Sequence, residues 1–169
     1  MKDAPKFVDR LQPALLDRLT DDDPTNRVEA AEQRVMSRTR LRAAVLRDLS
    51  WLFNATAPSE SAGLAAYPHV RGSVLGFGLP PLSGMATSSI DAATLEAKVR
   101  RAIIDHEPRI LPATLRVEAL VSEAQLDHHN QISFRIAGQL WAQPVPMELL
   151  LHTAIDLETG RVEIKELPR

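Results

Sequence analysis

The spacing of hydrophobic residues changes once along the chain. Before about residue 106 they recur with the period of an α-helix, and beyond Pro112 they alternate with polar residues at every second position. The first part therefore predicts helices and the second part predicts strands. This order favours an α+β fold in a single domain, with N-terminal helices followed by an antiparallel β-meander.

Four stretches predict helices of different strength. Residues 4–19 have a helix-like apolar stripe interrupted by Pro13, and residues 67–75 can form a short helix that opens with a proline. The pattern is strongest over 32–54 and from Asp91 to about His106, where apolar residues recur three or four positions apart. Ser88, Ser89 and Asp91 are the candidate N-caps of that last helix.

Residues 20–26 contain three consecutive aspartates and a proline, which predicts an exposed loop. We therefore divide the chain into an N-terminal arm with an acidic loop over residues 1–30 and an α+β domain over residues 31–169. The glycines of residues 76–84 match neither a Walker loop nor a dinucleotide-binding fingerprint, since no Gly-Lys-Ser/Thr follows and Pro81 replaces the third glycine.

The alternating pattern predicts strands over residues 115–121, 132–140, 147–155 and 161–167. Gly138 predicts a bulge in the second of them. Residues 156–160 end in a glycine and predict a hairpin turn. The last strand is short and charged, which is typical of a protected sheet edge and also of an edge to which another chain adds a strand.

Glu107, Pro108 and Arg109 lie between the last helix and the first strand. Proline disfavours helical backbone at the residue before it, so the helix should end at Glu107. In extended backbone Glu107 and Arg109 point to the same side and form a rigid corner that displays an acid and a base together. The alternative interpretation is a helix stop with two solvated charges.

Composition narrows the possible partners. The net charge is −2 and the isoelectric point is near 6.2, so we expect no nucleic acid. The absence of cysteine excludes disulfides and cysteine-ligated metals. We find no secretory signal and no apolar run long enough to span a bilayer, and we expect a cytoplasmic protein without direct membrane insertion.

Catalytic patterns are weak, and we expect no enzyme, no cofactor and no metal. Asp21 to Asp23 lack the spacing of a calcium loop, the adjacent His128 and His129 have no third ligand, and no serine-hydrolase elbow is present. Glu118, Asp127 and Ser133 follow the spacing of the catalytic residues of phage-type lysozymes, which leaves a peptidoglycan-cleaving hydrolase as the alternative function. However, that lysozyme motif begins on a helix, whereas Glu118 lies in a predicted strand.

Several stretches together resemble a known family. They are Leu15–Asp21, Leu46–Asn54, Tyr67–Val70, Ser73–Pro80, Glu107–Pro112 and Leu140–Pro146. In order and spacing they resemble the baseplate wedge proteins of bacterial type VI secretion systems, the TssE family, which is related to a wedge protein of contractile phage tails and was historically labelled lysozyme-like.

The resemblance implies a structural role. It implies that Glu107, Pro108 and Arg109 bind the helical core of the wedge, whose other subunits are TssF, TssG and TssK. It also implies that the protein helps to nucleate the contractile sheath of TssB and TssC, and that it works at the inner face of the cell envelope.

Overall fold

The computed structural model describes residues 13–20, 24–25, 36–58, 66–81, 91–120, 131–142 and 145–167. Within these residues, helices come first and a four-stranded sheet follows, as the hydrophobic pattern predicts. The elements in chain order are α1 (Leu15–Leu19), α2 (Arg38–Asn54), α3 (Pro68–Arg71), the 3-10 helix η3 (Val74–Gly76), α4 (Ala92–His106), β1 (Arg116–Leu120), β2 (Gln131–Leu140), β3 (Met147–Asp156) and β4 (Val162–Glu166).

The two long helices follow the predicted apolar stripes. In α2 the side chains of Leu41, Val45, Leu49 and Leu52 are buried, as expected from their spacing. The helix begins at Arg38 rather than near residue 32, because the Ser37 side chain caps it by accepting a hydrogen bond from the Arg40 backbone amide at 3.1 Å. Residues 32–35 lie outside the described part of the chain.

Helix α4 has the predicted limits. Its N-cap is Asp91, whose carboxylate accepts hydrogen bonds from the backbone amides of Ala93 and Thr94 at 3.3 and 3.2 Å. The other two candidate caps, Ser88 and Ser89, lie outside the described residues. The single helix predicted over residues 67–75 is wrong: Ser73 separates α3 from η3, because its hydroxyl donates to the Val70 carbonyl and accepts from the Leu75 amide.

The sheet is the predicted antiparallel meander, with strand order β1-β2-β3-β4. The bulge predicted at Gly138 is wrong, since β2 and β3 pair without interruption and Gly138 lies opposite Leu149. A Cβ atom on Gly138 would lie 3.4 Å from Ile110 Cγ2, so the glycine instead allows the segment before β1 to approach the sheet. The predicted turn after β3 is confirmed, with Gly160 at a φ of 72°.

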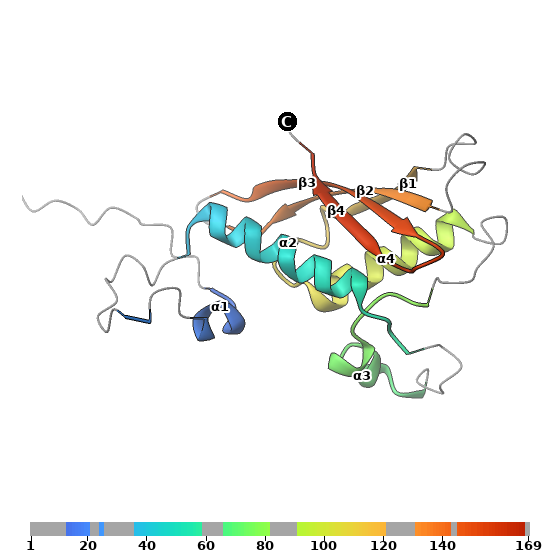
Figure 1. Cartoon of the computed structure of the whole chain (residues 1–169), viewed down its shortest axis with the longest axis horizontal. Helices are drawn as coiled ribbons and strands as arrows, with labels where there is room; N and C mark the ends of the chain where they lie inside the picture. Colours follow the sequence, from blue (N-terminus) through green and yellow to red (C-terminus); the bar gives the residue numbers. More distant parts are fainter. Residues whose placement is uncertain are drawn as a thin grey trace, which may run out of the picture.

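Helices α2 and α4 cover one face of the sheet (Figure 1). Helix α4 packs against β1 and α2 packs against β4. The core between the two layers is built from apolar side chains of both, among them Leu49, Leu52, Ile103, Phe134, Ile136, Leu149 and Leu151. No helix in the described part of the chain is both long and apolar enough to cross a membrane.

Candidate functional site

The corner at Glu107, Pro108 and Arg109 begins where α4 ends. The Glu107 amide makes the last hydrogen bond of the helix, to the Ile103 carbonyl at 2.8 Å, and its backbone then leaves the helical region. The Glu107 carbonyl accepts a hydrogen bond from the Ile110 amide at 3.2 Å, which closes a turn. The proline at position 108 prevents the helix from continuing, as predicted.

The backbone after Pro108 is fixed to the end of β2. The Trp141 amide donates to the Arg109 carbonyl at 2.7 Å, and the Leu111 amide donates to the Gln139 carbonyl at 2.8 Å. Ile110 forms an antiparallel bridge with Leu140 between these bonds. The corner is therefore held by the sheet on one side and by α4 on the other.

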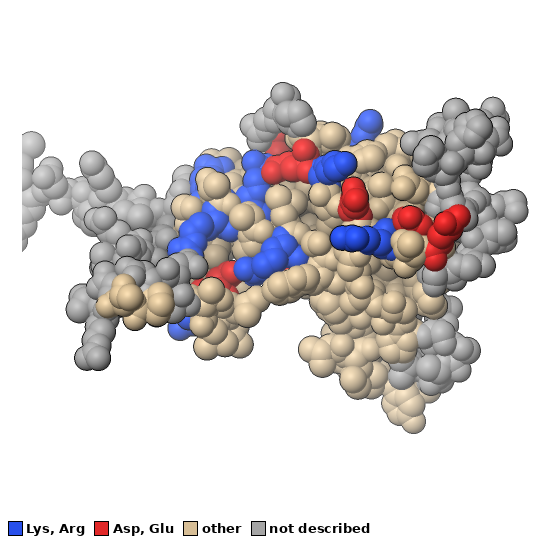
Figure 2. Space-filling view, in the orientation of Figure 1, with Lys and Arg blue, Asp and Glu red and all other residues tan. Residues whose placement is uncertain are grey.

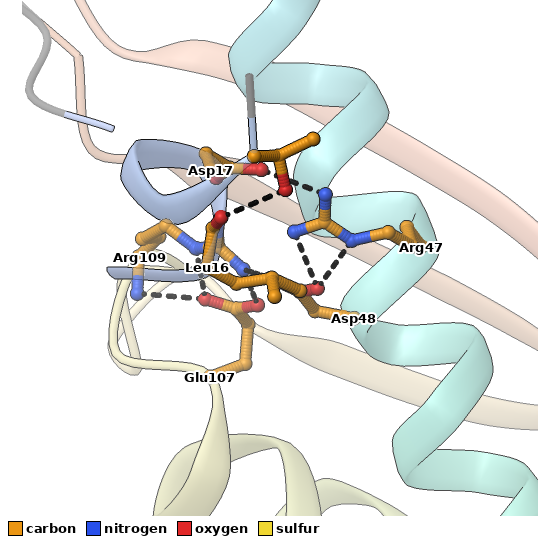
Figure 3. Close-up of polar contacts among 7 residues, drawn as sticks. Leu16, Asp17, Arg47, Asp48, Glu107 and Arg109 are labelled. Carbon is orange, nitrogen blue, oxygen red and sulfur yellow. Dashed lines mark hydrogen bonds and ion pairs between the residues drawn. The ribbon is translucent and has the colours of Figure 1, made fainter. Parts of the chain in front are cut away.

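The side chains of Glu107 and Arg109 bind each other (Figure 3). Arg109 Nε donates to Glu107 Oε1 at 2.7 Å, Nη2 donates to Oε2, and the Arg109 backbone amide also donates to Oε1 at 3.1 Å. This is the two-pronged geometry that suits a guanidinium and a carboxylate. Glu107 is only 3% exposed and the Arg109 side chain is 21% exposed, so neither is a solvated charge.

A chain of alternating charges extends from this pair across α2 to α1. Arg109 Nη2 reaches Asp48 Oδ2 at 2.5 Å, and the other oxygen of Asp48 accepts from Arg47 Nε at 2.9 Å. Arg47 Nη1 in turn donates to Asp17 Oδ1 at 2.7 Å. We call these five residues, Glu107, Arg109, Asp48, Arg47 and Asp17, the charge chain.

The electrostatic environment favours the charged form of both arginines. Burial works to lower the pKa of Arg109, but the hydrogen bonds and negative charge of Glu107, together with those of Asp48, outweigh burial and raise it. The hydrogen bonds that Arg47 donates to Asp17 and Asp48 raise the pKa of Arg47. Both side chains are therefore permanent cations, suited to binding carboxylates and unsuited to proton transfer.

Three polar atoms of the charge chain are buried and have no hydrogen-bond partner among the described residues. They are Arg109 Nη1, Asp17 Oδ2 and Arg47 Nη2, of which the last still forms an ion pair with Asp48 Oδ1 at 2.8 Å. Buried donors and acceptors nearly always find partners, because leaving one unpaired costs about 1–3 kcal/mol. The cluster thus retains one unused donor at the corner and one unused acceptor on α1.

The sequence correctly predicted that Glu107 and Arg109 lie together, but it did not predict which other residues surround them. The alternative of two solvated charges is wrong, because the carboxylate is buried. Asp48 was missed, since it is 61 residues from Arg109 and only the packing of α2 beside the corner brings the two together. The signal available was the adjacency of Asp48 and Arg47 on the polar side of a strongly patterned helix. The contact of the corner with a partner stays a prediction.

The other candidate residues do not form a site in the described part of the chain. Glu118 is exposed on β1 opposite Arg135, whereas Ser133 is buried on β2 opposite Leu120. Asp127, His128, His129 and the aspartates at positions 21–23 lie outside the described residues. Among the residues that are described, no group of three or more histidine, cysteine or acidic side chains is placed to hold a metal.

Lysine and arginine side chains on the face shown in Figure 2 are interspersed with acidic ones, along and beside α2. Arg42, for example, lies 2.9 Å from the carboxylate of Glu166 on β4. This face is therefore mixed in sign and offers no continuous basic patch of the kind that binds a phosphate backbone.

One comparison with known proteins gives a result that covers most of the chain. Residues 39–145 match the model of the family described as baseplate wedge protein gp25. The matched range includes α2, the corner and β2, and with them Arg47, Asp48, Glu107 and Arg109, whereas Asp17 lies before it. No curated protein and no solved structure matches the chain.

Proposed function

Because the chain belongs to the baseplate wedge protein gp25 family, we propose that it is the TssE-type subunit of a type VI secretion baseplate. In this role it is a structural protein that acts in the cytoplasm, at the inner face of the envelope, and helps the contractile sheath to begin assembly. The observation that carries the proposal is the family match, which spans both the corner and the helix to which the corner is tied. The resembling stretches along the whole chain support the same assignment.

The corner formed by Glu107, Pro108 and Arg109 is the proposed contact with the wedge subunits TssF, TssG and TssK. Arg109 is the residue best placed to reach a partner, because 21% of its side chain is exposed, although its Nη1 atom is buried. Glu107 orients the guanidinium from inside, and Pro108 is exposed at the tip of the turn. A guanidinium held in this way binds a carboxylate or a helix C-terminus with little loss of side-chain entropy.

Variants of Arg109 test this contact by co-purification of the wedge subunits. Arg109→Lys keeps the charge but loses the planar fork, and the double variant Glu107→Gln, Arg109→Gln removes both charges without leaving an unpaired one. Both should lose most of the bound wedge subunits, while Arg101→Gln, which removes a charge from the exposed face of α4, should retain them. Melting curves must show that the variants are folded. Normal co-purification by both folded corner variants would contradict the proposal.

The outer edge of β4 is the proposed contact with the sheath subunits TssB and TssC. The Asp156 backbone amide donates to the Arg161 carbonyl, and the Leu167 backbone amide donates to the Leu150 carbonyl. The odd-numbered residues of β4 therefore direct their backbone N–H and C=O groups toward β3. Val162, Ile164 and Glu166 then direct their backbone groups outward. Those of Val162 are taken by the Asn54 side chain, at 3.0 Å for each of two hydrogen bonds, which leaves Ile164 and Glu166 to pair with an added strand.

A substitution at Glu166 separates strand addition from a side-chain effect. Glu166→Pro removes an outward N–H at an edge position, where proline is tolerated, and Glu166→Gln removes the charge but keeps the N–H. Sheath assembly followed in cells by a fluorescent sheath subunit should fail with the proline variant alone. The proposal is wrong if sheaths form normally with Glu166→Pro, or if the glutamine variant fails equally.

A further inference from the structure

Helix α1 is attached to the rest of the protein weakly. None of its residues is buried, and its leucines at positions 15, 16 and 19 are 72%, 43% and 74% exposed. The ion pair between Asp17 and Arg47 joins α1 to α2, and the Asp17 side chain is 8% exposed. Because the leucines of α1 remain largely exposed, a partner that supplies another carboxylate to Arg47 can displace the helix.

The surface to which Asp17 binds has the properties of a docking site. Arg47 and Trp51 are one helical turn apart on α2, and the Arg47 guanidinium carbon lies 5.1 Å from the centre of the Trp51 ring. Trp51 is about half exposed. Tryptophan and arginine are the residues that most often dominate binding energy at protein interfaces, and here a cation is already held over an exposed aromatic face.

The charge chain connects this surface to the corner. Asp48 is shared between Arg47 and Arg109, and Figure 3 shows α1 beside α2 on the side where these three residues meet. A ligand that binds at Arg47 therefore lies next to a ligand that binds at Arg109. The family match includes Arg47, Trp51 and Arg109 and begins after α1, so this surface lies within the matched range and the helix on it lies outside that range.

We propose that the surface formed by Arg47 and Trp51 docks a helix of a neighbouring wedge subunit that carries a carboxylate among leucines, and that α1 occupies this surface until the partner displaces it. Helix α1 shows the chemistry of the occupant, since its sequence Leu-Leu-Asp-Arg-Leu places one acid between apolar residues. The inference rests on the proposed function, because it assumes that the corner beside this surface binds the wedge. The inference adds a second contact with the wedge, at Arg47 and Trp51. It also adds a competition between α1 and the partner helix for that surface.

The competition is tested by the affinity of the full-length variants for purified TssF and TssG. Asp17→Asn weakens the hold of α1 and should increase affinity by about 2–5-fold or more, because an exposed ion pair accounts for about that range and the Asp17 carboxylate is largely covered. Arg18→Gln changes a charge on the exposed side of the same helix and should leave affinity unchanged. Trp51→Ala leaves the charge chain in place and should reduce affinity by about tenfold or more.

Arg47→Gln distinguishes docking from simple release of α1. This variant also frees α1, so an increase in affinity equal to that of Asp17→Asn would overturn the proposal, whereas a decrease supports it. Unchanged or weaker binding by Asp17→Asn would overturn it as well. If Asp17→Asn has no effect while the Arg109 variants lose binding, only this inference fails. If the wild-type chain does not bind the wedge subunits, both proposals fail.

Discussion

Arg109 binds the carboxylate of Glu107 with both its backbone amide and its guanidinium group, two residues away across an intervening proline. The carboxylate is almost fully buried by this arrangement. A buried charge that keeps its partner is tolerated, and the same charge without its partner is strongly destabilising. The corner therefore contributes to the folding energy of the domain, in addition to its proposed role in binding.

Arg109→Ala should lower the free energy of unfolding by about 3–5 kcal/mol, because it leaves Glu107 buried without a counter-ion. Urea unfolding followed by circular dichroism measures the change. Adding Glu107→Gln to the same variant should recover part of the loss, since a neutral amide costs less to bury. A loss below about 1 kcal/mol in the single variant would show that the pair is not coupled as the distances indicate.

Gly78→Ala should destabilise the protein by more than about 1 kcal/mol. Gly78 has a φ of 127°, and a Cβ atom there would lie 2.5 Å from the Ala55 carbonyl oxygen, in the segment where Ala55 and Ala57 pair with Leu79. Gly72→Ala is the matched control, because nothing lies within 4 Å of its Cβ position. Equal melting temperatures for the two variants would refute the expected clash.

Asp156, in the turn after β3, should make the stability of the fold depend on pH in the acidic range. Hydrogen bonds from the backbone amides of Thr159 and Glu158 hold the pKa of Asp156 below its usual value. Because the pKa of Asp156 is lower in the folded protein than in the unfolded chain, its ionised form stabilises the fold. This stabilisation is complete above the pKa of the unfolded chain, about 3.8, and is lost as the pH falls through the pKa of the folded protein.

Asp156→Asn should therefore melt at a lower temperature than wild type at pH 7, and the difference should shrink as the pH falls below about 4. Thermal unfolding at a series of pH values measures the trend. Glu158→Gln removes a charge from the same turn without removing the carboxylate that accepts the amides, and it controls for net charge. A difference that grows toward acid pH would have the wrong sign for this explanation.

Asn54 should protect the backbone amide of Val162, the first residue of β4, from hydrogen exchange. Its side chain both donates to the Val162 carbonyl and accepts from the Val162 amide, across 108 residues of sequence. Asn54→Ala should cost about 1 kcal/mol and should speed hydrogen exchange of the Val162 amide. The Glu163 amide faces β3 and is the internal control. If both amides accelerate equally, the variant has loosened the whole strand and the specific role of Asn54 is wrong.

The elements with regular periodicity were predictable from sequence. The stripes of α2 and α4, and the alternation in β2 and β3, identify the buried residues because each pattern repeats over several turns or residue pairs. Local chemistry placed the N-cap at Asp91 and the left-handed glycine at position 160. The irregular positions were less predictable. Ser73 interrupts a short helix with its own hydrogen bonds, and Gly138 allows Ile110 to pack closely against β2 instead of forming a bulge.

The candidate site was half predictable for a physical reason. Glu107 and Arg109 are local, so proline geometry and side-chain alternation suggested that they act together. Their burial and their link to Asp48 depend on how α2 packs beside the corner, which no local pattern records. The attachment of Asp17 to Arg47 spans 30 residues and joins two separately predicted helices, so sequence spacing gave no indication of it.

Cross-linking from Pro108 tests the wedge assignment most directly. The sequence contains no cysteine, so Pro108→Cys provides a unique attachment point for a photoreactive maleimide at the exposed tip of the corner. Glu118→Cys, on the exposed side of β1, is the control position. In cells that contain the secretion system, position 108 should cross-link to TssF or TssG more strongly than position 118. Cross-links to wedge subunits from position 118 and none from position 108 would contradict the account.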